Sequence, residues 1–182
     1  LALWTSEKCI ISARKLMQES LNTLENWSKK WLLKINEQKT THTIFSLSRK
    51  PPKASLKLNG QALREDETPN YLGITLDRRL TWKTQIEKNQ VKAKVRLNIM
   101  RKLAGTKWGA NENVLKRLYT GRVRPVLEYG VSAWATASKT NFDKINRLQN
   151  QAFRIITGAM KSTPIIQMEN ATGLQSMEER RD

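Results

Sequence analysis

The first half of the chain changes the period of its hydrophobic and polar positions twice. Residues 11–33 carry an apolar side chain every third or fourth position, with charged residues between them, which predicts an amphipathic helix. From Thr41 to Phe45 the pattern alternates and is rich in β-branched residues, which predicts a strand. Leu1–Trp4 is short and apolar and indicates a buried strand.

Turn residues add a hairpin to this segment. Asn59-Gly60 separates two short runs with apolar residues, and this dipeptide favours the primed turn of a two-residue hairpin. Such a hairpin would place Leu56 opposite Leu63. The run Tyr71–Leu76 predicts a further strand, so the segment is expected to be α+β, with one long helix and several strands.

From Leu80 onward the pattern predicts a bundle of helices. Thr81, Asn111, Ser138 or Thr140, and Thr163-Pro164 are the expected starts, and Gly158 and Gly173 are expected stops. The second of these helices should bend or end before Pro125, because proline lacks an amide donor and clashes with the preceding turn. Among the tryptophans, three fall on apolar stripes and are predicted to be core: Trp27, Trp31 and Trp82.

The charge of the chain is large and unevenly spread. Lys and Arg total 33 against 16 Asp and Glu, a net charge of +17. Residues 78–161 hold 19 basic and 4 acidic side chains, whereas residues 1–77 hold 12 and 8 and residues 162–182 hold 2 and 4. A polyanion would relieve the self-repulsion of such a cluster. The clustering favours nucleic acid as partner over a membrane or an acidic protein.

Most of the candidate binding residues lie on the helix expected after Thr81. Its cations recur about four residues apart, with Glu87 as the one acidic residue between Thr81 and Ala110; they are Lys88, Lys92, Arg96 and Arg101, with Lys83 and Lys94 nearby. Such a face can meet phosphates through charge, without reading bases. The alternative is an ordinary solvated helix surface.

A turn follows this helix and holds two further candidates. Lys107 adds a cation, and Trp108 has the ring that stacks on a base or ribose in single-strand binding proteins. Packing in a core or loop is the alternative for Trp108.

Several kinds of catalytic site are absent from the sequence. Cys9 is the only cysteine and His42 the only histidine, so no internal disulfide and no Cys/His metal cluster can form. There is no Gly-Lys-Ser/Thr phosphate loop and no apolar run long enough to span a membrane. Residues 65–67 are expected to be solvated carboxylates, and Asp77 to pair locally with the arginines beside it. We therefore expect no metal ligands, no cofactor bound by this chain and no catalysis by the chain alone.

Several short motifs are weak signals singly but specific in their order and spacing. In chain order they are Leu1–Trp4, Trp31–Asn36, Lys39-Thr40, Tyr71–Asp77, Arg122–Gly130, Leu148–Gly158 and Ser162–Pro164. Together they resemble the reverse transcriptases of non-LTR retrotransposons of the jockey type, over essentially the whole chain. The resemblance implies an RNA-directed DNA polymerase, a nucleotidyltransferase whose parent enzyme uses Mg²⁺ on two aspartates that would directly precede Leu1.

The resemblance also implies a division of the chain. Residues 1–77 would be the last part of the palm, residues 78–161 a basic helical thumb, and residues 162–182 the start of a downstream connection. The expected fold class is thus α+β, a palm-like remainder of sheet and helix followed by an all-helical thumb bundle. The fingers and the rest of the palm would be missing partners, and with them the catalytic aspartates.

Two sites come from this resemblance alone. Lys39 matches a palm lysine near the incoming nucleotide and would protonate the pyrophosphate leaving group as a general acid; the alternative is an ordinary loop lysine. Tyr71, Leu72 and Gly73 match the primer grip, where glycine would let the backbone approach the primer strand.

The expected function follows from the resemblance and from the basic segment. The chain would be a fragment of a transposon-encoded reverse transcriptase that grips the duplex of RNA template and DNA primer, without a membrane partner. The alternative is a non-catalytic RNA- or DNA-binding protein derived from such an element. An intracellular location is expected, with the parent element in nucleus and cytoplasm.

Overall fold

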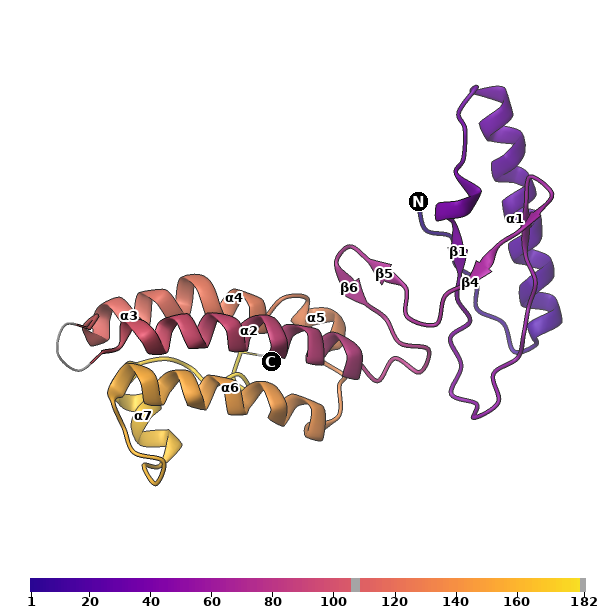
Figure 1. Cartoon of the computed structure of the whole chain (residues 1–182). Coiled ribbons are helices and arrows are strands. Elements are labelled where there is room, and N and C mark those ends of the chain that lie inside the picture. The colour runs from indigo at the N-terminus through magenta and orange to yellow at the C-terminus, as the bar shows by residue number, and fades with distance from the viewer. Residues whose placement is uncertain (106–108, 181–182) are drawn as a thin grey trace. The chain divides into compact units, whose positions relative to one another are not determined.

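The computed structural model describes residues 1–105 and 109–180. The chain forms two compact units, an N-terminal unit of residues 1–80 and a C-terminal unit of residues 81–182 (Figure 1). The N-terminal unit contains α1 (Ile10–Lys30), the 3₁₀ turn η1 (Glu37–Lys39), β1 (Thr41–His42), β2 (Lys57–Leu58), β3 (Gln61–Ala62), β4 (Arg64–Glu65), β5 (Asn70–Tyr71) and β6 (Ile74–Thr75).

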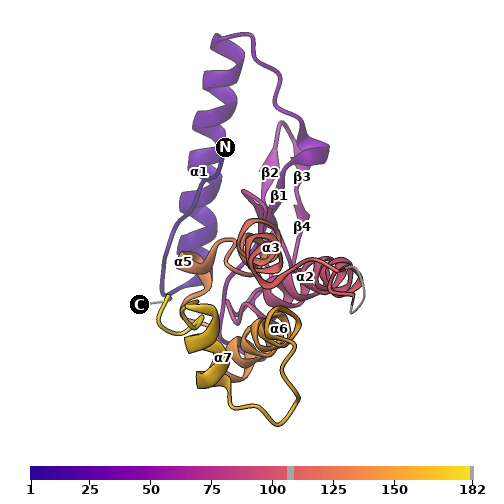
Figure 2. The same ribbon diagram turned by 90° about the vertical axis from the view of Figure 1, so that its left-hand side faces the viewer.

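The core of the N-terminal unit lies between α1 and one hairpin (Figure 2). Strands β2 and β3 pair antiparallel through a turn at Asn59-Gly60, both in the left-handed region with φ of 49° and 78°. The Leu63 amide donates to the Leu56 carbonyl at 2.8 Å, so the predicted hairpin and its pairing are confirmed. Leu56, Leu58 and Leu63 are buried there against Leu21 of α1.

Only one side of α1 is covered by this hairpin. Leu21 is 5% exposed, but Trp27 is 49% and Trp31 62% exposed, so the prediction that these two tryptophans are core is wrong. Each residue turns the helix by about 100°, and two-residue strands cover a narrow strip centred on Leu21 and the buried Ser28. The apolar stripe is therefore wider than the surface available to bury it.

The other strands of this unit are shorter than the pattern predicted. β1 pairs parallel with β4 over two residues, and the predicted strand continues no further than His42. Leu1–Trp4 forms no strand and is exposed, against the prediction. The run Tyr71–Leu76 is likewise not one strand. It holds the turn and second strand of a small hairpin of β5 and β6, with Leu72 and Gly73 at positive φ.

The C-terminal unit is helical in its described residues. Its elements are α2 (Lys83–Leu103), α3 (Glu112–Leu118), the π turn η2 (Tyr119–Val123), α4 (Arg124–Leu127), α5 (Val131–Trp134), α6 (Lys139–Thr157) and α7 (Ile165–Thr172). The two long helices, α2 and α6, run side by side in the same direction (Figure 1). Their facing sides carry buried residues such as Ile86, Leu97, Ile145 and Phe153. Trp82 is buried, as predicted.

Helix boundaries in this unit follow the residues expected to set them. The side chains of Asn111 and Ser138 accept hydrogen bonds from the third amide that follows each, at 3.0 and 3.4 Å. Gly158 and Gly173 end α6 and α7 in the left-handed conformation. Thr81 is not a cap, because α2 begins one residue later, after Trp82.

The tail of the described chain packs on α6. The buried Gln149 donates from Nε2 to the Gln175 carbonyl at 2.9 Å, and its Oε1 accepts from the Met177 amide at 2.9 Å. Met168 of α7, Leu174 and Met177 are buried. Residues 165–177 thus share the core of the helical unit.

Candidate nucleic-acid interface

The cations of α2 lie on two sides of the helix. At 3.6 residues per turn, Lys88, Lys92 and Arg96 follow one another at intervals of four residues and form one row, called the Lys88 row. Lys83, Lys94 and Arg101 are separated by eleven and seven residues, which are close to whole turns, and form a second row, the Lys83 row. Arg101, expected on the same face as Lys88, instead belongs to the Lys83 row.

Both rows face away from the core. All six side chains are exposed except Arg96, which is partly buried. The Arg96 guanidinium donates to the Arg122 carbonyl, and the Arg101 guanidinium donates to Asn98 Oδ1 at 2.8 Å. These contacts hold two of the predicted binding residues in place and leave charge on both.

Little negative charge accompanies the rows. Glu87 is the single carboxylate of α2, and it pairs with Lys144 of α6 at 3.3 Å. The helix therefore presents a strongly positive surface. A solvated charge pattern of the usual kind would alternate signs along the helix.

An exposed apolar stripe lies between the two rows. Val91, Val95 and Ile99 are 63%, 58% and 56% exposed, and they also follow one another every four residues. This stripe was not predicted from the sequence, although the spacing of four residues between its members indicates it. α2 thus has an outer face on which aliphatic side chains alternate with rows of cations.

Two other predicted binding residues, Lys107 and Trp108, lie outside the described residues.

The predicted primer-grip residues form the tip of the β5–β6 hairpin. Tyr71 pairs with Ile74, and the turn between them consists of Leu72 and Gly73, at φ of 49° and 79°. Tyr71 and Leu72 are exposed, by 51% and 75%. Gly73 is thus required by the turn itself, since positive φ strains most other residues.

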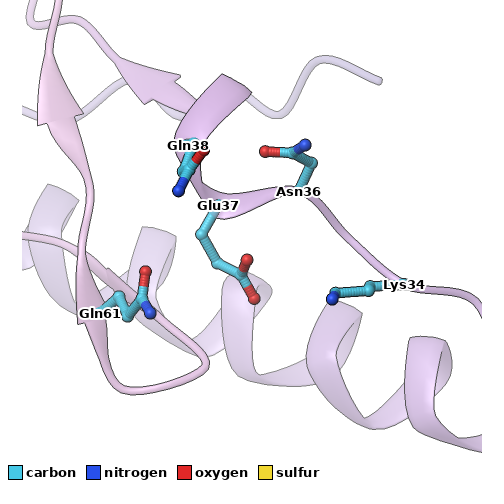
Figure 3. Close-up of a pocket in the computed structure, with 5 residues that line it drawn as sticks. All are labelled: Lys34, Asn36, Glu37, Gln38 and Gln61. Carbon is cyan, nitrogen blue, oxygen red and sulfur yellow. The ribbon is translucent and has the colours of Figure 1, made fainter.

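Lys39 is an exposed residue at the end of η1. Its amide donates to Asn36 Oδ1 at 3.0 Å, which caps the short turn. The adjacent pocket, of about 380 Å³, is lined by Lys34, Asn36, Glu37, Gln38 and Gln61, and Lys39 is not one of its lining residues (Figure 3).

Glu37 accounts for the negative charge in that pocket. Its carboxylate accepts a hydrogen bond from Asn59 Nδ2 at 2.7 Å, and this bond lowers the pKa of Glu37. Glu37 thereby joins the 3₁₀ turn to the tip of the β2–β3 hairpin, a contact that stabilises local structure.

Two other carboxylates of the N-terminal unit, Glu65 and Glu67, form ion pairs with Arg78. Arg78 bonds Glu65 at 2.6 Å, approaches Glu67 at 3.6 Å and donates to the Ile44 carbonyl at 3.2 Å. The expectation that residues 65–67 are merely solvated is therefore wrong for Glu65. Asp77 accepts from the Arg79 amide at 3.3 Å.

The described part of the chain contains no cluster of side chains that could bind a metal ion. No three His, Cys, Asp or Glu side chains there gather closely enough to hold a metal ion. The described residues do not fit the Mg²⁺ pair that the polymerase resemblance implies, because such a pair needs converging carboxylates. His42 Nε2 lies 3.0 Å from the Ala54 carbonyl, and Cys9 is exposed at the start of α1.

Within residues 1–105 and 109–180, every helix is too short or too polar to cross a membrane.

The chain is similar in sequence to several known proteins. It is 36% identical over 158 residues to the probable RNA-directed DNA polymerase from transposon BS of Drosophila melanogaster, a match that covers 86% of the chain. It is 30% identical over 158 residues to the RNA-directed DNA polymerase from mobile element jockey of the same fly, covering 87% of the chain. A third relative, the probable RNA-directed DNA polymerase from transposon X-element, is 25% identical over 153 residues.

These matches cover one part of each relative. The chain spans 17% of the length of the transposon BS and jockey polymerases. No protein-family model matches the chain, and no solved structure matches it. The resemblance that its motifs indicated is nevertheless confirmed: by sequence, the chain is related to one segment of the RNA-directed DNA polymerases of jockey-type and other non-LTR retrotransposons.

Proposed function

We propose that this chain is the part of a retrotransposon reverse transcriptase that grips the duplex of RNA template and DNA primer. The observation that carries the proposal is the outer face of α2, where two rows of exposed cations accompany a single, paired carboxylate. The relatives are RNA-directed DNA polymerases by name, and a polymerase must hold such a duplex while it extends the primer.

The physical basis of the grip is the release of counterions. Lysine and arginine side chains that neutralise phosphates release the ions condensed on the nucleic acid, so affinity falls steeply with salt. Along the Lys88 row, four residues rise by about 6 Å, so successive cations meet different phosphates. Such contacts hold the backbone and read no base sequence.

In this proposal the N-terminal unit is the remainder of the palm and the C-terminal unit is the thumb. The exposed tip at Tyr71 and Leu72 supports a contact with the primer strand. The role of Lys39 as a general acid stays a prediction. We also expect no primer extension by this chain alone, since its described carboxylates form no metal site. Mg²⁺ would act in the parent enzyme.

The salt dependence of binding tests the proposal. Affinity of the full chain for an RNA–DNA duplex, followed by fluorescence anisotropy, should fall on a straight line when its logarithm is plotted against the logarithm of salt concentration. Replacing Lys88 and Lys92 together by alanine should reduce that slope by about two, because two fewer phosphates are neutralised.

The matched control removes the same charge elsewhere. Lys29→Ala with Lys30→Ala takes two exposed cations from the last turn of α1 and should leave the slope unchanged. Affinity that stays flat between low and moderate salt would contradict the phosphate grip. Equal losses in both double variants would place the binding charge outside α2.

A further inference from the structure

A cationic pocket lies where the two long helices end. It has a volume of about 650 Å³ and is lined by Arg101 of α2, by Gln151, Arg154 and Ile155 of α6, and by Lys161. The residues meet because α2 and α6 run in the same direction: Glu87 pairs with Lys144 near their starts, and Arg101 and Arg154 come together near their ends. Gly158 then turns the chain so that Lys161 reaches the same pocket.

The pocket has a marked excess of positive charge. Its lining holds two arginines and one lysine and no carboxylate. Cations near helix C-termini are often explained by the helix dipole, which places about half a negative charge at each end. Two helix ends therefore offset roughly one of the three positive charges, and about two remain to attract an anion.

Arg154 is the least exposed of the three cations in the pocket. Its Nη1 and Nη2 atoms donate to the carbonyls of Asn150 and Lys161 over long distances of 3.3 and 3.4 Å. Its Nε atom is buried and has no hydrogen-bond partner among the described residues. The guanidinium thus lines the pocket with only two long hydrogen bonds, and an anion that enters the pocket would be attracted by its charge.

We propose that this pocket binds a phosphate group of the nucleic acid held by α2. A guanidinium presents paired N–H donors that match phosphate oxygens, and two arginines with a lysine are a common set for this ligand. Gln151 adds an amide donor, and Ile155 supplies an apolar wall. The inference rests on the proposed function, and it extends the contact surface from the outer face of α2 to the ends of α2 and α6.

The first experiment compares two double variants of the full chain in duplex binding. Arg101→Ala with Lys161→Ala removes the two exposed cations of the pocket and should lower the salt slope by about two and the affinity at moderate salt by at least about tenfold. The control, Arg117→Ala with Lys139→Ala, removes two exposed cations of the same unit that do not line the pocket. Equal effects of the two double variants would overturn the proposal.

The second experiment observes the pocket without the duplex. The buried Nε–H of Arg154 should give a resolved nitrogen–proton NMR signal, identified by its loss in Arg154→Lys. Titration with inorganic phosphate should shift this signal in the wild-type chain, and Gln151→Glu should abolish the shift by adding a negative charge. A signal that does not move with phosphate would refute the pocket even if the duplex binds.

The two results separate the inference from the proposed function. A shift with phosphate in a chain that does not bind duplex would support the pocket and refute the grip. Duplex binding with a steep salt slope, but with no phosphate-induced shift of the Arg154 signal, would support the grip and refute the pocket.

Discussion

The hydroxyl of Tyr119 is buried inside the C-terminal unit without a hydrogen bond among the described residues. It lies beside Gln149, whose amide is already bonded to Gln175 and Met177. The Tyr119 ring meets that of Phe153 edge to face, with centroids 5.9 Å apart. Burial holds the pKa of the phenol above its ordinary value of 10.0, and Arg124 offsets part of the effect.

This raised pKa predicts a loss of stability in alkali. The unfolded chain releases the Tyr119 proton once the pH passes 10.0, whereas the folded chain retains it. The contribution of Tyr119 to the free energy of unfolding is therefore complete below pH 10.0. It is lost as the pH rises toward the higher pKa of the folded state. The free energy of unfolding should fall by up to about 1.4 kcal/mol per pH unit in this window.

Urea unfolding at about pH 9 and about pH 11 provides the measurement. Tyr119→Phe should remove this part of the alkaline loss, and at neutral pH it should be neutral or slightly stabilising, because it deletes an unbonded buried hydroxyl. Tyr129→Phe, at a half-exposed position, is the control. The same alkaline loss in wild type and Tyr119→Phe would contradict the assignment to this phenol.

At the scale of elements, Pro125 determines how the helical stretch around it is built. α3 passes into the π turn η2, whose last bond runs from the Arg124 amide to the Tyr119 carbonyl, and α4 follows with Pro125 near its start. Because proline cannot donate to the preceding turn, the wider turn carries the chain past it. As predicted, the α-helix ends before Pro125, because α3 ends at Leu118 and the π turn follows it.

The start of this stretch gives a second prediction. Asn111 Oδ1 accepts from the Val114 amide at 3.0 Å, so Asn111→Ala should lower the free energy of unfolding by about 1 kcal/mol. Asn113→Ala, at an exposed position inside α3, is the control and should change stability little. The two variants can be compared by urea unfolding followed by circular dichroism. Equal losses would show that capping is not the cause.

The elements that the sequence predicted well are those with their own boundary residues. α6 has an apolar period of three to four, a serine cap and a glycine stop, and all three are found in the structure. For α1 the period was equally clear, yet Trp27 and Trp31 are exposed. Periodicity shows which side chains share a face, but not how much surface the partner element offers.

The candidate site was predicted in part for a similar reason. Charge counting located α2, because a lack of carboxylates is visible in the sequence. It did not separate Arg101 from the Lys88 row. Arg101 follows Arg96 by five residues, and this spacing places the two side chains on different sides of the helix, whereas a spacing of four keeps them nearly on one side. Nor can the pocket shared by Arg101, Arg154 and Lys161 be read from the sequence, because it depends on the parallel packing of α2 and α6.

At the scale of the whole molecule, the two units differ in core and in charge. Residues 1–80 carry 14 basic and 8 acidic side chains, and residues 81–182 carry 19 and 8. The buried core of the N-terminal unit consists of Leu21, Leu56, Leu58 and Leu63, whereas the helical unit buries many more large residues. The units should therefore unfold in separate transitions, with the N-terminal unit first.

Leu58→Ala tests this expectation by calorimetry. Leu58 is fully buried, so the substitution should cost about 2–5 kcal/mol and shift the first transition to lower temperature, while the second stays in place. Leu47→Ala makes the same chemical change at an exposed position and should move neither transition. One shared transition that shifts as a whole would refute independent unfolding.

The placement of the tryptophans has an optical consequence. In the N-terminal unit Trp4, Trp27 and Trp31 are open to water, so their emission should lie at long wavelength and be quenched readily by acrylamide. In the helical unit Trp82 and Trp134 are buried and should emit at shorter wavelength, out of reach of the quencher. Unfolding of the helical unit should therefore shift the emission to longer wavelength. A molecule that binds over α1 should instead protect its tryptophans from quenching by acrylamide.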